Sequence, residues 1–260
     1  MGILSDVLDE LLPANDPHAQ VLELCWKAQC AFNWSHLDEA RLLATRAFEL
    51  LPSESWYRSE ALHHLHQLLG LLDLKNDDRR AAKEHLSASA GVETTPFLSS
   101  FGPSMLLADA LLKLGEREAV LDYFDACRQL WGSAESRLKV WSEQVREGRF
   151  PDSSYNRHQS SATAPLCWEL RRSDTVLGRL YLRTKDNAWF VCTFEPMADF
   201  TDMQQSLQHN FRDIPDDTSD LEDAYGRLQE LQLVLHPGDR GPPVTDAVIQ
   251  VQSDTAYFRY

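Results

Sequence analysis

The sequence of 260 residues predicts an α+β protein of two domains, an all-α domain at 1–148 and a small antiparallel-sheet α+β domain at 166–260. Up to about residue 147, apolar residues recur at the spacing of three or four that amphipathic helices require. After residue 165 they alternate with a period of two, which is typical of half-buried strands. Residues 149–165 show neither period and are rich in serine and proline, so they predict a linker.

The helices of the first domain are expected to form pairs. After a short helix at 3–12, the predicted ranges are 18–32 with 36–51, 54–75 with 77–90, 104–114 with 117–131, and a last helix at 134–147. Ala28, Ala40, Ala47 and Pro52 lie 12, 7 and 5 residues apart. Helix-turn-helix repeats use this spacing, because small residues let two helices approach closely and proline ends the second one.

The boundaries of these pairs have their own signals. Ser35 is the predicted N-cap of the helix at 36–51, because a serine side chain can accept a hydrogen bond from the first turn. Gly70 and Ala82 repeat the 12-residue interval of the first pair. Residues 91–103, rich in Gly, Thr, Ser and Pro, are expected to connect the second pair to the third.

The second domain is expected to begin with an antiparallel meander. Trp168 and Leu170 alternate with Glu169 and Arg171, and similar strands follow at 176–183 and 188–194. One face of this sheet is therefore predicted to be buried. The domain is completed by two predicted helices at 198–212 and 218–232 and by three strands at 233–236, 246–252 and 255–260.

Several segments resemble known proteins. Residues 100–105, followed by 115–124, resemble a repeat of bacterial tetratricopeptide-repeat-like (TPR-like) proteins of uncharacterised function. Residues 168–172 with 177–180, and the ending 256–260, resemble a small α+β domain of uncharacterised bacterial proteins. The resemblance implies a bacterial cytoplasmic protein and carries over no catalytic residue. Arrays of helical repeats mostly bind other proteins, so a protein-binding role is expected.

The charge of the chain bears on its partners. The formal net charge is −15 at pH 7 and the pI is about 4.9. Binding to the phosphates of DNA or RNA is therefore not expected, whereas a basic protein would be attracted. No apolar run approaches the length of about 18 residues that spans a membrane, so no membrane partner is expected. Five cysteines without a C-x-x-C pair, and the lack of a signal-peptide pattern, favour a cytoplasmic location.

Two groups of residues are candidates for partner binding. Trp34 and Trp56 lie near helix junctions, where they would anchor a bound segment; the alternative is that they are core residues. Asp216, Asp217 and Asp220 belong to an acidic cluster that would dock a basic partner. The alternative for this cluster is a solvated helix start, where carboxylates suit the positive end of the helix.

These features lead to three functional hypotheses. The first is a non-enzymatic interaction or adaptor protein that binds a partner in a groove of the helical repeats. The alternative is an immunity-type protein or inhibitor that neutralises a basic toxin. A further alternative is a metal-dependent hydrolase centred on His63 and His66, within the group Glu60, His63, His64 and His66. The sequence has no P-loop, G-x-S-x-G or H-E-x-x-H motif, so no catalytic residue, metal or cofactor is predicted.

Overall fold

The computed structural model describes residues 17–55, 57–153, 156, 167–186, 189–207, 226, 229–238 and 241–260. It confirms the predicted fold class, because a helical region is followed by a six-stranded antiparallel sheet. Contacts within the chain divide it into two compact units. The described residues from 17 to 156 form a helical unit, and those from 167 to 260 form a sheet unit.

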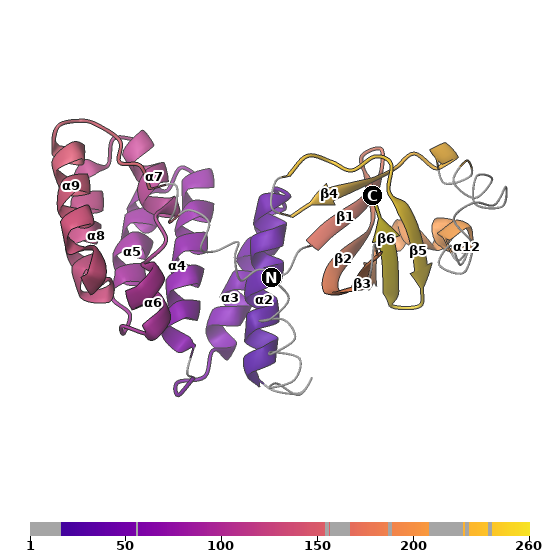
Figure 1. Cartoon of the computed structure of the whole chain (residues 1–260), viewed down its shortest axis with the longest axis horizontal. Helices are drawn as coiled ribbons and strands as arrows, with labels where there is room; N and C mark the ends of the chain where they lie inside the picture. Colours follow the sequence, from indigo (N-terminus) through magenta and orange to yellow (C-terminus); the bar gives the residue numbers. More distant parts are fainter. Residues whose placement is uncertain are drawn as a thin grey trace. The chain divides into compact units, whose positions relative to one another are not determined.

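The helical unit is a stack of helices (Figure 1). Its elements are α2 (Pro17–Asn33), α3 (Leu37–Leu50), α4 (Arg58–Lys75), α5 (Arg79–Ala90), α6 (Pro96–Phe101), α7 (Leu106–Lys113), α8 (Arg117–Leu130), the 3-10 turn η1 (Gly132–Ala134) and α9 (Glu135–Arg146). Helix α2 packs on α3, α4 packs on α5, and α5 packs on α8. The helices predicted between residues 18 and 147 are present within a few residues of their expected bounds, whereas the predicted helix at 3–12 lies outside the described residues.

Alanines form the surfaces along which the first two helices pack. Ala28 of α2 and Ala40, Ala44 and Ala47 of α3 are fully buried. On α3 these residues recur every three or four positions, so they line one side of the helix. Their short side chains let the helix axes approach closely, as the spacing in the sequence predicts.

The prediction that Ser35 caps α3 is wrong. Ser35 has a positive φ of 69° and belongs to the turn between α2 and α3. The N-cap of α3 is His36, which makes no side-chain capping hydrogen bond. The φ of an N-cap residue is negative and extended, so a left-handed Ser35 cannot take this role.

The predicted connector at 91–103 contains a short helix, α6. Its N-cap is Thr95, whose Oγ1 accepts a hydrogen bond from the N–H of Leu98 at 3.2 Å. Pro96 follows at the start of the helix, where its missing N–H has no partner to lose. Six residues are too few to show helical periodicity, and the Thr-Pro pair is the local signal for this helix.

Side chains of α5 and α7 pack closely against Gly70 of α4. A Cβ at this position would lie 2.3 Å from Cδ2 of Leu107 and 3.1 Å from Cβ of His85. A separation of 2.3 Å is well inside van der Waals contact, so any larger residue forces α7 or its side chains to move.

The substitution Gly70→Ala is expected to destabilise the helical unit by about 1–2 kcal/mol, since overpacking outweighs the better helix propensity of alanine. Gly91→Ala is the matched control, because the nearest atom to a Cβ there is 3.5 Å away. Urea unfolding followed by circular dichroism measures both variants. Equal unfolding midpoints for the two variants would contradict the close packing at Gly70.

The sheet unit contains six antiparallel strands in the spatial order β4-β1-β2-β3-β6-β5 (Figure 1). Their bounds are β1 (Cys167–Arg172), β2 (Thr175–Asp186), β3 (Trp189–Pro196), β4 (Leu233–Pro237), β5 (Val248–Gln252) and β6 (Thr255–Arg259). Every predicted strand is present. The 3-10 helix η2 (Ala198–Met203) and α12 (Gln204–Leu207) stand where a helix at 198–212 is predicted; most of the predicted helix at 218–232 lies outside the described residues.

One face of the sheet carries the hydrophobic core. Trp168 and Phe258 meet with ring centroids 4.8 Å apart, and Phe258 stacks on Phe190 at the same distance. Phe200 of η2 packs on Phe194 of β3. The expectation of a single buried face is wrong along β1, because Cys167 and Glu169 point away from Trp168 and are buried too.

The two ends of the sheet meet through one bridge. Strand β4 is the first strand in the spatial order and β5 is the last. Residues 241–247, which lead into β5, return to β4, and Leu235 and Val244 exchange two backbone hydrogen bonds of 2.9 Å. The sheet is therefore curled, and we call the line between β4 and residues 244–247 the seam.

Candidate functional site

The predicted partner-binding residues are only partly described. Trp34 lies half-buried in the turn between α2 and α3, and its backbone N–H donates to the carbonyl of Cys30 at 2.9 Å. It is therefore partly core and partly surface. Trp56, Asp216, Asp217 and Asp220 lie outside the described residues.

The histidines of α4 do not converge on a metal site. Nδ1 of His63 donates to the carbonyl oxygen of Ser89 at 2.7 Å, and Nε2 accepts from the N–H of Ser104 at 2.9 Å. Both nitrogens of His63 are thus engaged, and His66 contacts His85 instead. Within the described ranges, no group of three or more His, Cys, Asp or Glu side chains is arranged to hold a metal ion. The residues proposed for the hydrolase are therefore not assembled into a site.

The buried thiols are poor nucleophiles. Cys25, Cys127 and Cys192 are free and buried. Burial raises the pKa of the Cys25 thiol to about 12, and burial raises the pKa of Cys127 as well. A reactive cysteine needs a thiolate at neutral pH, so these two residues act as small core side chains.

A polar cluster lies across α3, α4 and α5. We call it the histidine cluster and define it by Arg41, Phe48, His66, Asp73 and His85. The rings of Phe48 and His66 meet edge to face with centroids 5.2 Å apart, and those of His66 and His85 are 5.1 Å apart. Nδ1 of His66 lies 2.9 Å from Nδ1 of His85. At the other end, Arg41 Nη2 lies 2.8 Å from Asp73 Oδ1, and Asp73 Oδ2 lies 3.5 Å from His85 Nε2.

The histidine cluster forms because its residues are spaced along their helices so that they lie on facing sides. Arg41 and Phe48 are seven residues apart on α3, and His66 and Asp73 are seven apart on α4, so each pair lies on one side of its helix. Gly70 lies between His66 and Asp73 on the same side of α4, and its missing side chain lets His85 of α5 approach. The packing of α4 on α5 therefore creates the histidine pair.

Both histidines of the cluster are neutral at pH 7. Burial lowers the pKa of His66 to about 4, and the neighbouring His85 contributes to this shift. Burial also lowers the pKa of His85, although Asp73 opposes the change. The carboxylate of Asp73 favours a hydrogen on Nε2 of His85, which makes His85 Nδ1 the acceptor and His66 Nδ1 the donor. The cluster thus offers half-exposed rings and a neutral hydrogen-bonding edge.

Exposed apolar residues of α3 extend this surface. Leu42 is 71% exposed and Phe48 is 39% exposed. With the exposed Thr45, these residues recur every three positions, so they form one ridge on the helix surface. We call Leu42, Thr45 and Phe48 the α3 ridge. Because Phe48 contacts His66, the ridge and the histidine cluster form one continuous surface.

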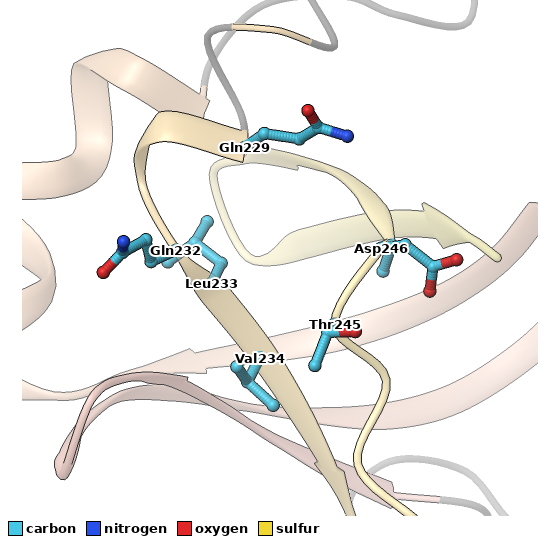
Figure 2. A pocket seen from close by; sticks show the side chains of 7 residues that line it. Gln229, Gln232, Leu233, Val234, Thr245 and Asp246 are labelled. Carbon is cyan, nitrogen blue, oxygen red and sulfur yellow. The ribbon is translucent and has the colours of Figure 1, made fainter.

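A second candidate site is a cavity of about 360 Å³ at the seam of the sheet unit (Figure 2). Its lining residues are Gln229, Gln232, Leu233, Val234, Thr245, Asp246 and Ala247. Figure 2 shows Leu233 and Val234 on one side of the opening, facing the segment that carries Thr245 and Asp246. The cavity therefore lies between the end strand of the sheet and the segment that leads into β5.

Sequence patterns did not point to either surface. His66 and His85 are 19 residues apart, and they meet only through the packing of two helices. The lining of the seam cavity comes from two chain segments whose pairing depends on how the sheet curls. The interval from Gly70 to Ala82 was the one sequence signal related to the first site, since it marks where α4 and α5 approach closely.

Comparisons with models of protein families, with curated proteins and with solved structures found no match. The likeness to TPR-like proteins therefore stays a prediction from the sequence. Across the part of the chain that the structure describes, no helix is both long enough and apolar enough to cross a membrane.

Proposed function

We propose that this protein is a non-enzymatic interaction protein that binds another protein through its helical unit, at the surface formed by the α3 ridge and the histidine cluster. The observation that carries the proposal is the exposure of Leu42, at 71%, beside a row of partly exposed rings from three helices. Aromatic and arginine side chains are enriched in protein interfaces, where a few of them supply most of the binding energy.

The cluster is suited to recognition. Phe48 and Leu42 supply apolar area, whereas the neutral ring of His66 supplies its Nε2 as a hydrogen-bonding atom without a charge that must be desolvated, since its Nδ1 is used on His85. The ion pair between Arg41 and Asp73 holds one end of the surface in place. The net charge of −15 supports a basic partner, because opposite charge speeds the encounter of two proteins.

The test is affinity capture with the full-length protein, comparing wild type with Leu42→Asp and Val140→Asp. Val140 of α9 is 50% exposed, so its substitution is a matched control at a distant helix. A partner of this surface is expected to bind wild type and Val140→Asp, and to bind Leu42→Asp at least about tenfold more weakly. Circular dichroism checks that all three proteins are folded.

A partner that binds Leu42→Asp as tightly as wild type would contradict the proposed surface. Repeating the capture at low and high salt tests the basic partner, since attraction between exposed charges is screened by salt. Binding that is unchanged between about 50 and about 500 mM salt, over which the screening length falls about threefold, would show that apolar contacts dominate.

A further inference from the structure

We propose that the seam cavity binds an extended segment of a partner protein, about two or three residues long, which carries a basic side chain. This site is in the sheet unit and goes beyond the proposed surface of the helical unit. The bound segment would form hydrogen bonds with β4, at the place where β4 and residues 245–247 separate.

The register of the seam identifies the cavity as an interrupted strand pair. Leu235 is opposite Val244 in an antiparallel bridge. Continuing that register would place Val234 opposite Thr245, Leu233 opposite Asp246, and Gln232 opposite Ala247. All six of these residues line the cavity, and no pair beyond Leu235–Val244 joins the described segments 229–238 and 241–247. The two segments therefore diverge where a continuous ladder would run.

The backbone of Leu233 is directed toward this opening. Leu235 uses its N–H and its C=O on Val244, on the side of β4 away from β1. Alternate residues of a strand direct their backbone groups to the same side, so the N–H and C=O of Leu233 point toward Asp246. On the other side of the bridge, two residues after Leu235, the residue whose backbone faces the same way is Pro237, which has no N–H to donate. Backbone pairing is thus available on the cavity side of the bridge.

The side chains define what fits the cavity. Leu233 and Ala247 are half-buried and pack against the core of the sheet, so they form an apolar base. Gln229, Gln232, Thr245 and Asp246 also line the cavity, and they are exposed and polar. Among the described residues of the lining, Asp246 alone carries a charge, which favours a lysine or arginine in the bound segment.

The volume limits the size of the occupant. A cavity of about 360 Å³ is at the small end of the range for ligand sites, about 300–1,000 Å³. It admits a short stretch of extended chain rather than a folded domain. The segment would form main-chain hydrogen bonds to β4, as peptides do when they add to the end of a sheet.

The test uses the full-length protein and a phage-displayed library of random heptapeptides. Peptides enriched on wild type are expected to contain lysine or arginine and to slow the amide exchange of residues 229–238 in hydrogen–deuterium exchange. Asp246→Asn is expected to weaken the binding of these peptides about threefold, because an exposed ion pair contributes little to affinity. Thr245→Trp, which fills the cavity from an exposed position, should weaken it more than about tenfold.

Two matched controls separate this site from other surfaces. Asp254→Asn removes an exposed carboxylate of the sheet unit that does not line the cavity, and Leu42→Asp alters the surface proposed on the helical unit. Both variants should bind the peptides like wild type. The proposal is overturned if the library yields no binder, or if binders keep their affinity for both Asp246→Asn and Thr245→Trp. Loss of binding in Leu42→Asp alone would also overturn it, and would assign the peptides to the helical unit.

Discussion

Between pH 7 and pH 4, the helical unit is expected to lose about 3 kcal/mol of its free energy of unfolding through His63 alone. His63 is 5% exposed and lies between α4, α5 and the start of α7. Burial lowers its pKa from 6.5 to about 4. Its two hydrogen bonds also require the neutral ring, because Nε2 must accept from the N–H of Ser104.

The direction of this effect follows from proton binding. Below pH 6.5 the unfolded chain takes up a proton on His63, whereas the folded protein does not do so until about pH 4. The unfolded state therefore binds more protons throughout this window, and the stability present above pH 6.5 falls as the pH is lowered. His66, whose pKa is also lowered to about 4, adds to the loss in the same direction.

Urea unfolding at a series of pH values from 7 to 4, followed by circular dichroism at 222 nm, measures this loss. The variant His63→Gln is expected to be less stable at pH 7 and to show a smaller dependence of stability on pH between 4 and 6.5, because one buried titrating group is gone. An unchanged pH dependence in this variant would show that His63 does not titrate differently in the folded and unfolded states.

A buried network explains why His63 is held so firmly. Tyr123 of α8 donates to the carbonyl of Ser104 at 2.7 Å, and Gln67 Oε1 accepts from the N–H of Leu107 at 3.1 Å. Gln67 Nε2 also donates to Ser89 Oγ at 2.9 Å. The same segments that bind His63 are thus held by side chains of α4 and α8, so the ring cannot turn toward water when it is protonated.

The sequence was informative where the signals are local. The period of 3.6 and the glycine at residue 115 predict a pair of helices at 104–114 and 117–131, and the structure contains α7 and α8 with Gly115 at a φ of 85° between them. The alternation of Trp168 and Leu170 predicts β1 in the same way. Local patterns succeed here because each element buries one side against a neighbour.

Tertiary contacts limit what the sequence can predict. The apolar period places Glu169 on the outer face of β1, yet this side chain is fully buried. The histidine pair depends on how far α5 approaches Gly70, and the seam cavity depends on where one strand pair opens. Such features arise between segments that are distant in the sequence, so a period read along one segment contains no information about them.

The substitution Glu169→Leu is expected to destabilise the sheet unit by about 3–5 kcal/mol, since it removes one partner of a buried ion pair. Glu169 of β1 is opposite Arg179 of β2, and Arg179 Nε lies 3.4 Å from Glu169 Oε1. The side chain of Arg179 is 10% exposed, so without the carboxylate its charge stays buried. Arg171, which also contacts Glu169, is 22% exposed and can turn toward water.

The double variant Glu169→Leu with Arg179→Met separates the loss of this ion pair from the cost of a buried guanidinium that lacks the Glu169 carboxylate. Removing both charges is expected to restore most of the stability, because a buried ion pair gains little over apolar side chains of similar volume. Asp254→Asn, at an exposed carboxylate of the same unit, should change stability by less than about 0.5 kcal/mol. If the double variant is as unstable as Glu169→Leu, the buried guanidinium is not the source of the loss, and Glu169 acts through its other contacts. If the double variant instead recovers its stability, the charge of Arg179 is the reason that β1 requires a glutamate at position 169. The alternating pattern of β1 gives no sign of this requirement, because it concerns a residue of the neighbouring strand.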